Sequence, residues 1–222
     1  MPTPAHLAAR NNADWCDLFC RASGVATRFE RDRWLALRRS PPLHPDAVTL
    51  AEHPRDVLAG LDVTPGCSVK DSFAALDLAP AGFRTLFEAE WIHRPPAAPA
   101  GAPPACRRVR TPAELAGWAA AHGGSFPPVL LRDPSVVVVG VYDGDRLTGG
   151  AIGNRSARCA GVSNLFGDVW DEAVAAISAC FPGLPLVGYE TPEVLPAARA
   201  AGFATAGELR VWLVPGGDPH AP

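Results

Sequence analysis

The chain has 222 residues, of which 48% are hydrophobic, and a formal net charge of −3. It contains no run of about 18 apolar residues and no basic start followed by an apolar core, so we expect a cytoplasmic protein without a membrane span or signal peptide. Basic residues form no stripe beyond Arg38-Arg39 and Arg107-Arg108. We therefore expect no nucleic-acid partner.

Two residue types are unusual in number. The chain has a single lysine, Lys70, among 20 basic residues, and it has six cysteines. Cys16 and Cys20 lie one helical turn apart, but no second close pair or His-x-x-x-His spacing completes a metal site. We predict buried free thiols and no metal cofactor.

The clearest boundary is the stretch 95–104, Pro-Pro-Ala-Ala-Pro-Ala-Gly-Ala-Pro-Pro. Such a segment has no periodicity and behaves as an extended linker. It divides residues 1–94 from a second domain, 105–216, and we expect residues 217–222 to form a disordered tail.

In the first region we predict a helix over 12–22 that is capped by Asn12. An irregular stretch follows, which holds Trp34 and the segment Pro41-Pro42-Leu43-His44-Pro45. We then predict a strand over 47–50, a helix over 54–61 and a strand–helix–strand unit over 67–92.

The second region is easier to interpret. Thr111-Pro112-Ala113-Glu114 has the pattern of a capping box and predicts a helix that stops at Gly123-Gly124. Asp143-Gly144 predicts a tight hairpin turn, and Asp168 is the expected cap of a helix that ends at Cys180. Around these signals we expect strands at 106–110, 136–142, 146–153, 159–166, 186–190 and 208–214, with a short helix ending at Gly202.

The pattern of residues 184–214 recurs in residues 67–92. Each stretch reads as a strand, a short helix, a Gly-Phe pair and a second strand that contains Trp. Glycine at the end of a helix permits a left-handed conformation, which is costly for a residue with a Cβ atom. The recurrence predicts two related half-domains, and a chance match is the alternative.

The element order of residues 105–214 is β-α-β-β-β-α-β-α-β, with Gly202-Phe203 before the last strand. This order resembles the GCN5-related N-acetyltransferase (GNAT) fold, and residues 1–94 resemble it more loosely. The expected fold class is α/β with a mixed sheet, in which a shorter, degenerate GNAT-like half precedes a GNAT-like C-terminal half. A helical crossover makes the strands 159–166 and 186–190 parallel neighbours. The resemblance implies that these two strands splay apart and that acetyl-CoA, or another acyl-CoA, inserts its arm between them.

Two signatures of the GNAT family are missing. The pyrophosphate loop R/Q-x-x-G-x-G/A is replaced by residues 163–168, Ser-Asn-Leu-Phe-Gly-Asp, which contain one glycine and end in an acid that would repel phosphate. The family often has a tyrosine four residues before the Gly-Phe pair as general acid, and this chain has Ala198 there. The acyltransferase prediction therefore rests on fold analogy.

The candidate catalytic residues are Tyr189 and Glu190, at the end of the strand beside the expected splay. Glu190 could remove a proton from an amine and Tyr189 could donate one, although a strand end that meets solvent is the alternative. Ser163, Asn164 and Gly167 are the candidate cofactor-binding residues. As turn formers before a helix, they need no function.

We predict four substrate-binding residues, Lys70, Asp71, Arg210 and Trp15. Lys70 could bind a carboxylate or a phosphate, and because neighbouring strand residues point to opposite faces, Asp71 cannot share its pocket. Arg210 could anchor an anion from the face opposite the apolar residues of its strand. A solvated position is the alternative for Lys70 and Arg210, and a core position for Trp15. His44 and His93 are further bases without an identifiable nucleophile partner.

We therefore predict an acyltransferase that moves an acyl group from a CoA thioester to a small amine by direct attack, in a pocket where the two halves meet. One alternative is an enzyme of this fold that uses an aminoacyl or carrier-bound substrate, or that performs decarboxylation or isomerisation. The other is a non-catalytic protein that binds a ligand or belongs to an assembly. A homodimer is left open.

Overall fold

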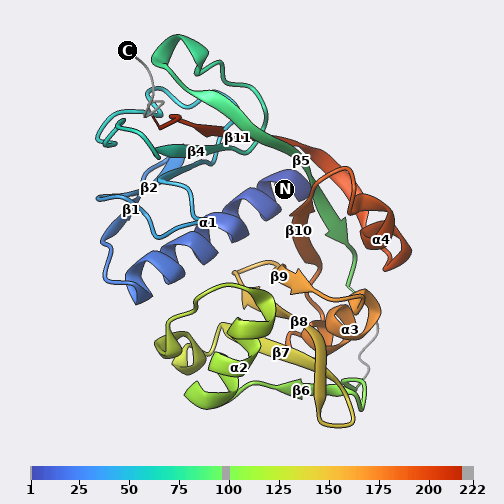
Figure 1. Cartoon of the computed structure of the whole chain (residues 1–222). Coiled ribbons are helices and arrows are strands. Elements are labelled where there is room, and N and C mark those ends of the chain that lie inside the picture. Colours follow the sequence, from blue (N-terminus) through green and yellow to red (C-terminus); the bar gives the residue numbers. More distant parts are fainter. Residues whose placement is uncertain (1, 97–100, 217–222) are drawn as a thin grey trace.

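The structure is a computed structural model that describes residues 2–96 and 101–216. Its strands form one eleven-stranded mixed sheet, with helices on both faces (Figure 1). The helices are α1 (Pro4–Ala22), α2 (Pro112–His122), α3 (Trp170–Cys180) and α4 (Leu195–Ala200), with short 3-10 helices at Ala79–Ala81 and Pro128–Arg132. The strands are β1 (Thr27–Phe29), β2 (Arg33–Ala36), β3 (Ala47–Thr49), β4 (Ser68–Asp71), β5 (Arg84–Arg94), β6 (Cys106–Arg108), β7 (Val136–Asp143), β8 (Arg146–Arg155), β9 (Ala160–Phe166), β10 (Leu186–Glu190) and β11 (Ala204–Leu213).

The strand order is β1-β2-β3-β4-β11-β5-β10-β9-β8-β7-β6. Strand β11 lies between β4 and β5, antiparallel to both, so the end of the chain completes the part of the sheet built by the first region. Two neighbouring pairs are parallel, β3–β4 and β9–β10. The second of these is the predicted parallel pair, which is confirmed.

The faces of the sheet follow from the alternation of side chains along each strand. On β7, Val137 and Val139 pack in one cluster with α3 and α4. Val136 and Val138 point the other way and pack with Trp118 of α2 and with aromatic residues of α1. The apolar run of β7 is therefore buried on both faces, as expected of a central strand.

Several local signals are confirmed. Thr111 and Glu114 form the capping box of α2, and Gly123 ends that helix in the left-handed region at φ 81°. The hairpin turn lies between β7 and β8. Gly82 and Gly202 both have left-handed φ values, 85° and 88°. At these positions a Cβ atom would strain the backbone.

The first helix begins eight residues earlier than predicted. Its cap is Thr3, whose hydroxyl accepts a hydrogen bond from the His6 amide, and Pro4 occupies the first turn. The prediction of Asn12 as cap is therefore wrong. The added turns are alanine-rich, and they pack against Trp91 and Val211 of the sheet.

Three further predictions are wrong. Residues 54–61 form turns, because the Arg33 guanidinium takes the Asp56 and Val57 carbonyls that a helix would use internally. Asp168 does not cap α3, which has Val169 at its cap position and no side-chain cap. The stretch around Trp34, expected to be irregular, contains β1 and β2.

Of the predicted linker, residues 97–100 lie outside the described residues, as does the predicted tail, 217–222. Within the described ranges, no helix combines the length and hydrophobicity that a bilayer crossing requires.

Helix α1 is held on the sheet by two buried amides. The Asn11 side chain donates to the Asn154 carbonyl at 3.0 Å, and the Asn154 side chain donates to the Asn11 carbonyl at 3.3 Å. Both side-chain oxygens face Gly161 of β9, where a Cβ atom would overlap them. Because both amides are buried and hydrogen-bonded, neither can move away cheaply.

We predict that Gly161→Ala lowers the free energy of unfolding by about 1–3 kcal/mol, because the methyl group overpacks this contact. The matched control is Gly117→Ala on α2, where nothing lies within 4 Å of the added methyl group. It should stabilise the protein by about 0.5–1 kcal/mol through helix propensity. Urea unfolding measures both, and equal effects of the two substitutions would contradict this account of α1 docking.

Candidate functional site

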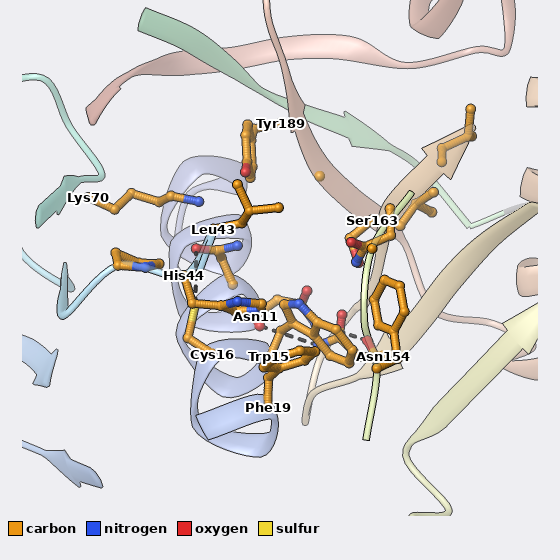
Figure 2. A pocket seen from close by; sticks show the side chains of 18 of the residues that line it. Asn11, Trp15, Cys16, Phe19, Leu43, His44, Lys70, Asn154, Ser163 and Tyr189 are labelled. Atoms are coloured by element: carbon orange, nitrogen blue, oxygen red, sulfur yellow. Dashed lines mark hydrogen bonds between the residues drawn. The ribbon is translucent and has the colours of Figure 1, made fainter. Parts of the chain in front are cut away.

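A cavity of about 750 Å³ lies between α1, the loop 41–45 and the open end of the β9–β10 pair. Figure 2 shows Lys70, His44 and Tyr189 on one side of it and Ser163 on the other, with Trp15 and Phe19 of α1 below. Its walls come from both regions of the chain. A pocket where the two regions meet was predicted, and this cavity occupies that place.

The cavity exists at this point because β9 and β10 separate. They pair only at Leu186–Ala160 and Val187–Gly161, although β10 continues to Glu190. At Gly188 the two strands are still close, since a Cβ atom there would lie 2.8 Å from the Val162 carbonyl oxygen. Beyond this residue the β9-facing backbone of β10 has no strand partner and lines the cavity.

Tyr189 forms the aromatic edge of the opening. Its ring meets Trp91 edge-on with 5.7 Å between centroids, and the Lys70 ammonium lies over its face, 3.9 Å from Nζ to the centroid. The Trp91 indole is fixed in turn, because its N–H donates to the Ser72 carbonyl at 2.7 Å. Trp91 and Lys70 therefore both restrict the position of the Tyr189 ring where it lines the cavity.

Glu190 is the acid at the end of β10. Burial raises the pKa of its carboxyl to about 7. Among the described residues, no hydrogen bond or ion pair offsets this desolvation. A carboxyl with a pKa near neutrality can both accept and release a proton at physiological pH, which suits a general base.

His44 enters the cavity from the loop 41–45. Its Nδ1 atom lies 3.1 Å from the Pro42 carbonyl oxygen. The His44 ring stacks on the Phe19 ring, with 3.9 Å between the ring centroids. Since a carbonyl only accepts, Nδ1 carries the proton and Nε2 keeps its lone pair. Burial, with a smaller contribution from the Lys70 charge, lowers the pKa of His44 to about 4. At neutral pH His44 is an uncharged base.

Cys16 is the cavity's thiol, and it is unreactive. Burial raises its pKa to about 12. The thiolate is the nucleophilic form of cysteine, so Cys16 is not a nucleophile at physiological pH. Across the parts of the chain that the structure describes, no three His, Cys, Asp or Glu side chains group closely enough to hold a metal ion.

The structure brings six of the nine predicted site residues to the cavity: Trp15, Lys70, Ser163, Asn164, Tyr189 and Glu190. The remaining three lie elsewhere. Asp71 accepts from the Leu76 amide at 2.8 Å on the other face of β4. Arg210 is paired with Glu88 at 2.8 Å, and Gly167 lies in the turn before α3. His93, the further base, does not line the cavity either.

The sequence left His44 without a partner and did not predict the pairing of Asn11 with Asn154 or the part of the cavity lined by the loop 123–127. The signal for His44 was its position among three prolines, which stiffen a short loop. Leu43 in the same loop has φ 68° and is 94% exposed at the cavity mouth. A strained backbone of this kind is frequent at functional sites. The two asparagines lie 143 positions apart in the chain, so no local sequence pattern predicts that they pair.

The residues fit one part of a coenzyme A molecule and not the other. The unpaired edge of β10 could bind an extended pantetheine arm, beside Ser163 and Asn164, whose φ is 52°. The pyrophosphate would fall at the start of α3, where Asp171 and Glu172 occupy the first turn after Asp168. Three carboxylates oppose the attraction that a helix N-terminus normally has for phosphate. The nucleotide half therefore does not fit.

No protein-family model and no curated protein matches the chain. Among solved structures, a GCN5-related N-acetyltransferase from Kribbella flavida is similar, with a TM-score of 0.65 and 12% identity, over 95% of this chain and 96% of that one. A candidate GNAT-family acetyltransferase from Novosphingobium aromaticivorans has a TM-score of 0.62 and 14% identity, over 92% and 97% of the two chains. This chain has the GNAT fold. The predicted resemblance is confirmed at the level of the fold, and the low identities show the fold alone.

We predict that Glu190→Gln changes how stability depends on pH. Because the pKa of Glu190 in the folded protein lies above the ordinary glutamate pKa of 4.5, the unfolded state releases this proton first. Wild-type stability should therefore fall relative to Glu190→Gln between about pH 4.5 and 7, by on the order of 2 kcal/mol, and stay lower above pH 7.

Urea unfolding at pH 5, 6, 7 and 8 measures this difference. The control is the neighbouring Glu193→Gln, since a hydrogen bond from Thr191 lowers the pKa of Glu193. Because the pKa of Glu193 is lowered in the folded protein, its ionisation stabilises the protein as pH rises. The stability of the wild type should therefore not fall relative to Glu193→Gln between about pH 4.5 and 7. A flat difference between wild type and Glu190→Gln would show that Glu190 titrates normally.

Proposed function

We propose that the protein is an acyltransferase that transfers an acyl group from a thioester to a small amine in the cavity of about 750 Å³. The observation that carries this proposal is the opening of β9–β10 beside Tyr189 and Glu190. The GNAT fold of acetyltransferases from other organisms supports the reaction class. Their low identity supports no particular substrate.

In the proposed mechanism, a substrate that enters as its ammonium ion first releases one proton to solvent, so that the neutral amine is the nucleophile. The amine nitrogen forms a bond to the thioester carbonyl carbon, the Glu190 carboxylate accepts the second proton from that nitrogen, directly or through water, and the carbon–sulfur bond breaks. Glu190 afterwards releases its proton to solvent. Tyr189 donates a proton to the departing thiolate and regains one from solvent. Glu190 suits its part because a base with a pKa near 7 is half ionised at neutral pH while it remains strong enough to accept a proton.

A direct attack is favoured over an acyl–enzyme intermediate. Cys16 is the cavity's thiol, and with a pKa of about 12 it stays protonated. The hydroxyl of Ser163 receives a hydrogen bond from Asn164 at 3.0 Å. No base that would activate this hydroxyl is hydrogen-bonded to it among the described residues, so the site lacks an activated nucleophile.

We predict that Glu190→Gln lowers kcat/KM for acyl transfer by about 10²–10⁴-fold, the usual contribution of a general base. Wild-type kcat/KM should rise with pH through about 7, because the carboxylate is the active form. The assay detects the amide product by mass spectrometry, with acetyl-pantetheine as donor and a panel of primary amines. Glu193→Gln is the matched control and should keep wild-type activity. Full activity of Glu190→Gln would exclude Glu190 as the base.

The three carboxylates at the start of α3 favour a second version of this function, in which the donor carries no nucleotide. A pantetheine thioester, whether free or attached to a carrier, would use the strand opening without approaching Asp168 and its neighbours. An enzyme of the same fold that decarboxylates or isomerises such a substrate would also use the strand opening and avoid the acidic start of α3.

We predict that acetyl-pantetheine serves as donor at least as well as acetyl-CoA. In an enzyme that binds pyrophosphate, loss of the nucleotide removes binding energy and lowers kcat/KM. The double variant Asp168→Asn, Asp171→Asn should raise the affinity for acetyl-CoA several-fold and leave that for acetyl-pantetheine unchanged. Calorimetric titration measures both. Much tighter binding of acetyl-CoA to the wild type would contradict this version.

We also propose that the sheet derives from two related half-domains that exchange their last strands. The support is the mirrored strand order: outward from the central β11–β5 pair, each side continues with an antiparallel strand, then a parallel neighbour, then antiparallel strands. The recurring Gly-Phe units, at Gly82 and Gly202, precede β5 and β11, the two strands that would be exchanged.

A further inference from the structure

Lys70 is the chain's single lysine, and it is almost wholly buried, with 4% of the residue exposed. It extends from β4 so that its ammonium group reaches the cavity under the Tyr189 ring (Figure 2). A buried ammonium is costly unless a counter-charge or several hydrogen-bond acceptors compensate it. The position of Lys70 therefore requires an explanation.

The described residues do not provide this compensation. None of their ion pairs or hydrogen bonds includes the Lys70 ammonium, and its close contact is the Tyr189 ring at 3.9 Å. Asp71 points to the other face, where backbone amides occupy its carboxylate. The groups near Lys70 are also uncharged at neutral pH: the His44 ring is a neutral base, and the Cys16 thiol keeps its proton.

We propose that Lys70 is the anchor for a carboxylate of the ligand that occupies the cavity. The carboxylate would accept hydrogen bonds from the ammonium group and neutralise its charge. The organic part of the ligand would pack against Trp15, Phe19 and Trp91, which line the same space.

The choice of carboxylate over phosphate follows from the number of charges. No arginine appears among the described residues that line the cavity. A phosphate dianion is usually met by several cationic or amide donors, whereas a single ammonium balances one negative charge. Glu190 in the same cavity would add repulsion for a dianion whenever it is ionised.

Together with the proposed function, this assigns the class of the acyl acceptor. An amine whose nitrogen meets Glu190 while its carboxylate meets Lys70 is an amino acid or a similar amino-carboxylic acid. The amine part of this assignment rests on the proposed acyl transfer. The carboxylate part does not, because it follows from the unpaired cation alone.

The test compares pairs of ligands that differ only in this charge, such as 4-phenylbutyrate with 4-phenylbutyramide and N-acetylphenylalanine with its amide. Affinities are measured by ligand-observed NMR and by quenching of tryptophan fluorescence. We expect each carboxylate to bind at least about tenfold more tightly than its amide, because a charge-assisted hydrogen bond is lost in the amide.

The diagnostic variant is Lys70→Met, which keeps the length of the side chain and removes the charge. It should abolish the preference for carboxylates, whereas Lys70→Arg should retain part of it. Because Lys70→Met also removes an unpaired buried charge, its urea midpoint should rise. The control is Arg210→Met, a cation of the neighbouring strand that lies outside the cavity and is paired with Glu88. It should leave the preference unchanged.

Three results would overturn the proposal: equal binding of carboxylates and amides, an undiminished preference in Lys70→Met, or no binding of any carboxylate. Failure of the proposed acyl transfer is a separate result. Carboxylate binding needs no turnover, so it stays measurable in a protein without activity. Conversely, acylation of uncharged amines alone would support the transferase and reject the Lys70 anchor.

Discussion

Helix α1 rests on the sheet through the reciprocal hydrogen bonds of Asn11 and Asn154 above Gly161. This contact joins the first helix to β8 and β9. It fixes the position of α1 on the sheet so that Trp15 and Phe19 line the cavity at the opening between β9 and β10. Buried amides tolerate little displacement, since each lost hydrogen bond leaves a desolvated polar group. A polar contact therefore helps to position α1, which forms one wall of the cavity, while apolar clusters on either side of the sheet contribute to stability.

Burial sets the charge of the cavity. The same desolvation leaves Glu190 half protonated near pH 7, keeps His44 neutral and keeps Cys16 a thiol. Lys70 is the exception, because it brings a positive charge into this space without a partner among the described residues. One cation beside a neutral imidazole and a half-ionised carboxyl is the arrangement that supports the proposed amino-carboxylic acid ligand. The acidic start of α3 opposes the binding of a ligand that carries a diphosphate.

The similar solved structures have the same chain path as this protein at 12–14% identity. This similarity establishes the fold, but it does not identify the reaction. The fold contributes the separation of two parallel strands, a feature of the backbone. The residues placed there are particular to this chain: Glu190 and Tyr189 at the strand end, and Ala198 where a tyrosine is common in the family. Function therefore has to be argued from the side chains of the cavity.

The sequence by itself determined the features that depend on neighbours in the chain. The capping box at Thr111, the hairpin after β7 and the left-handed Gly82 and Gly202 each follow from local backbone preferences, and so did the element order that predicted the GNAT fold. The separation of β9 and β10 was expected from that resemblance, and with it the place of Tyr189 and Glu190. Local preference failed where distant groups compete for the backbone, as at residues 54–61, whose carbonyls are taken by Arg33.

Only the tertiary structure decided which polar groups meet across the sheet. It placed β11 between β4 and β5, brought Asn11 to Asn154, and left Lys70 buried without a counter-charge. These outcomes depend on contacts between residues far apart in the chain, and the cost of burying a charge or an amide appears only once its surroundings are assembled. Periodicity and spacing carry no information about that cost, because they describe only the path of the backbone.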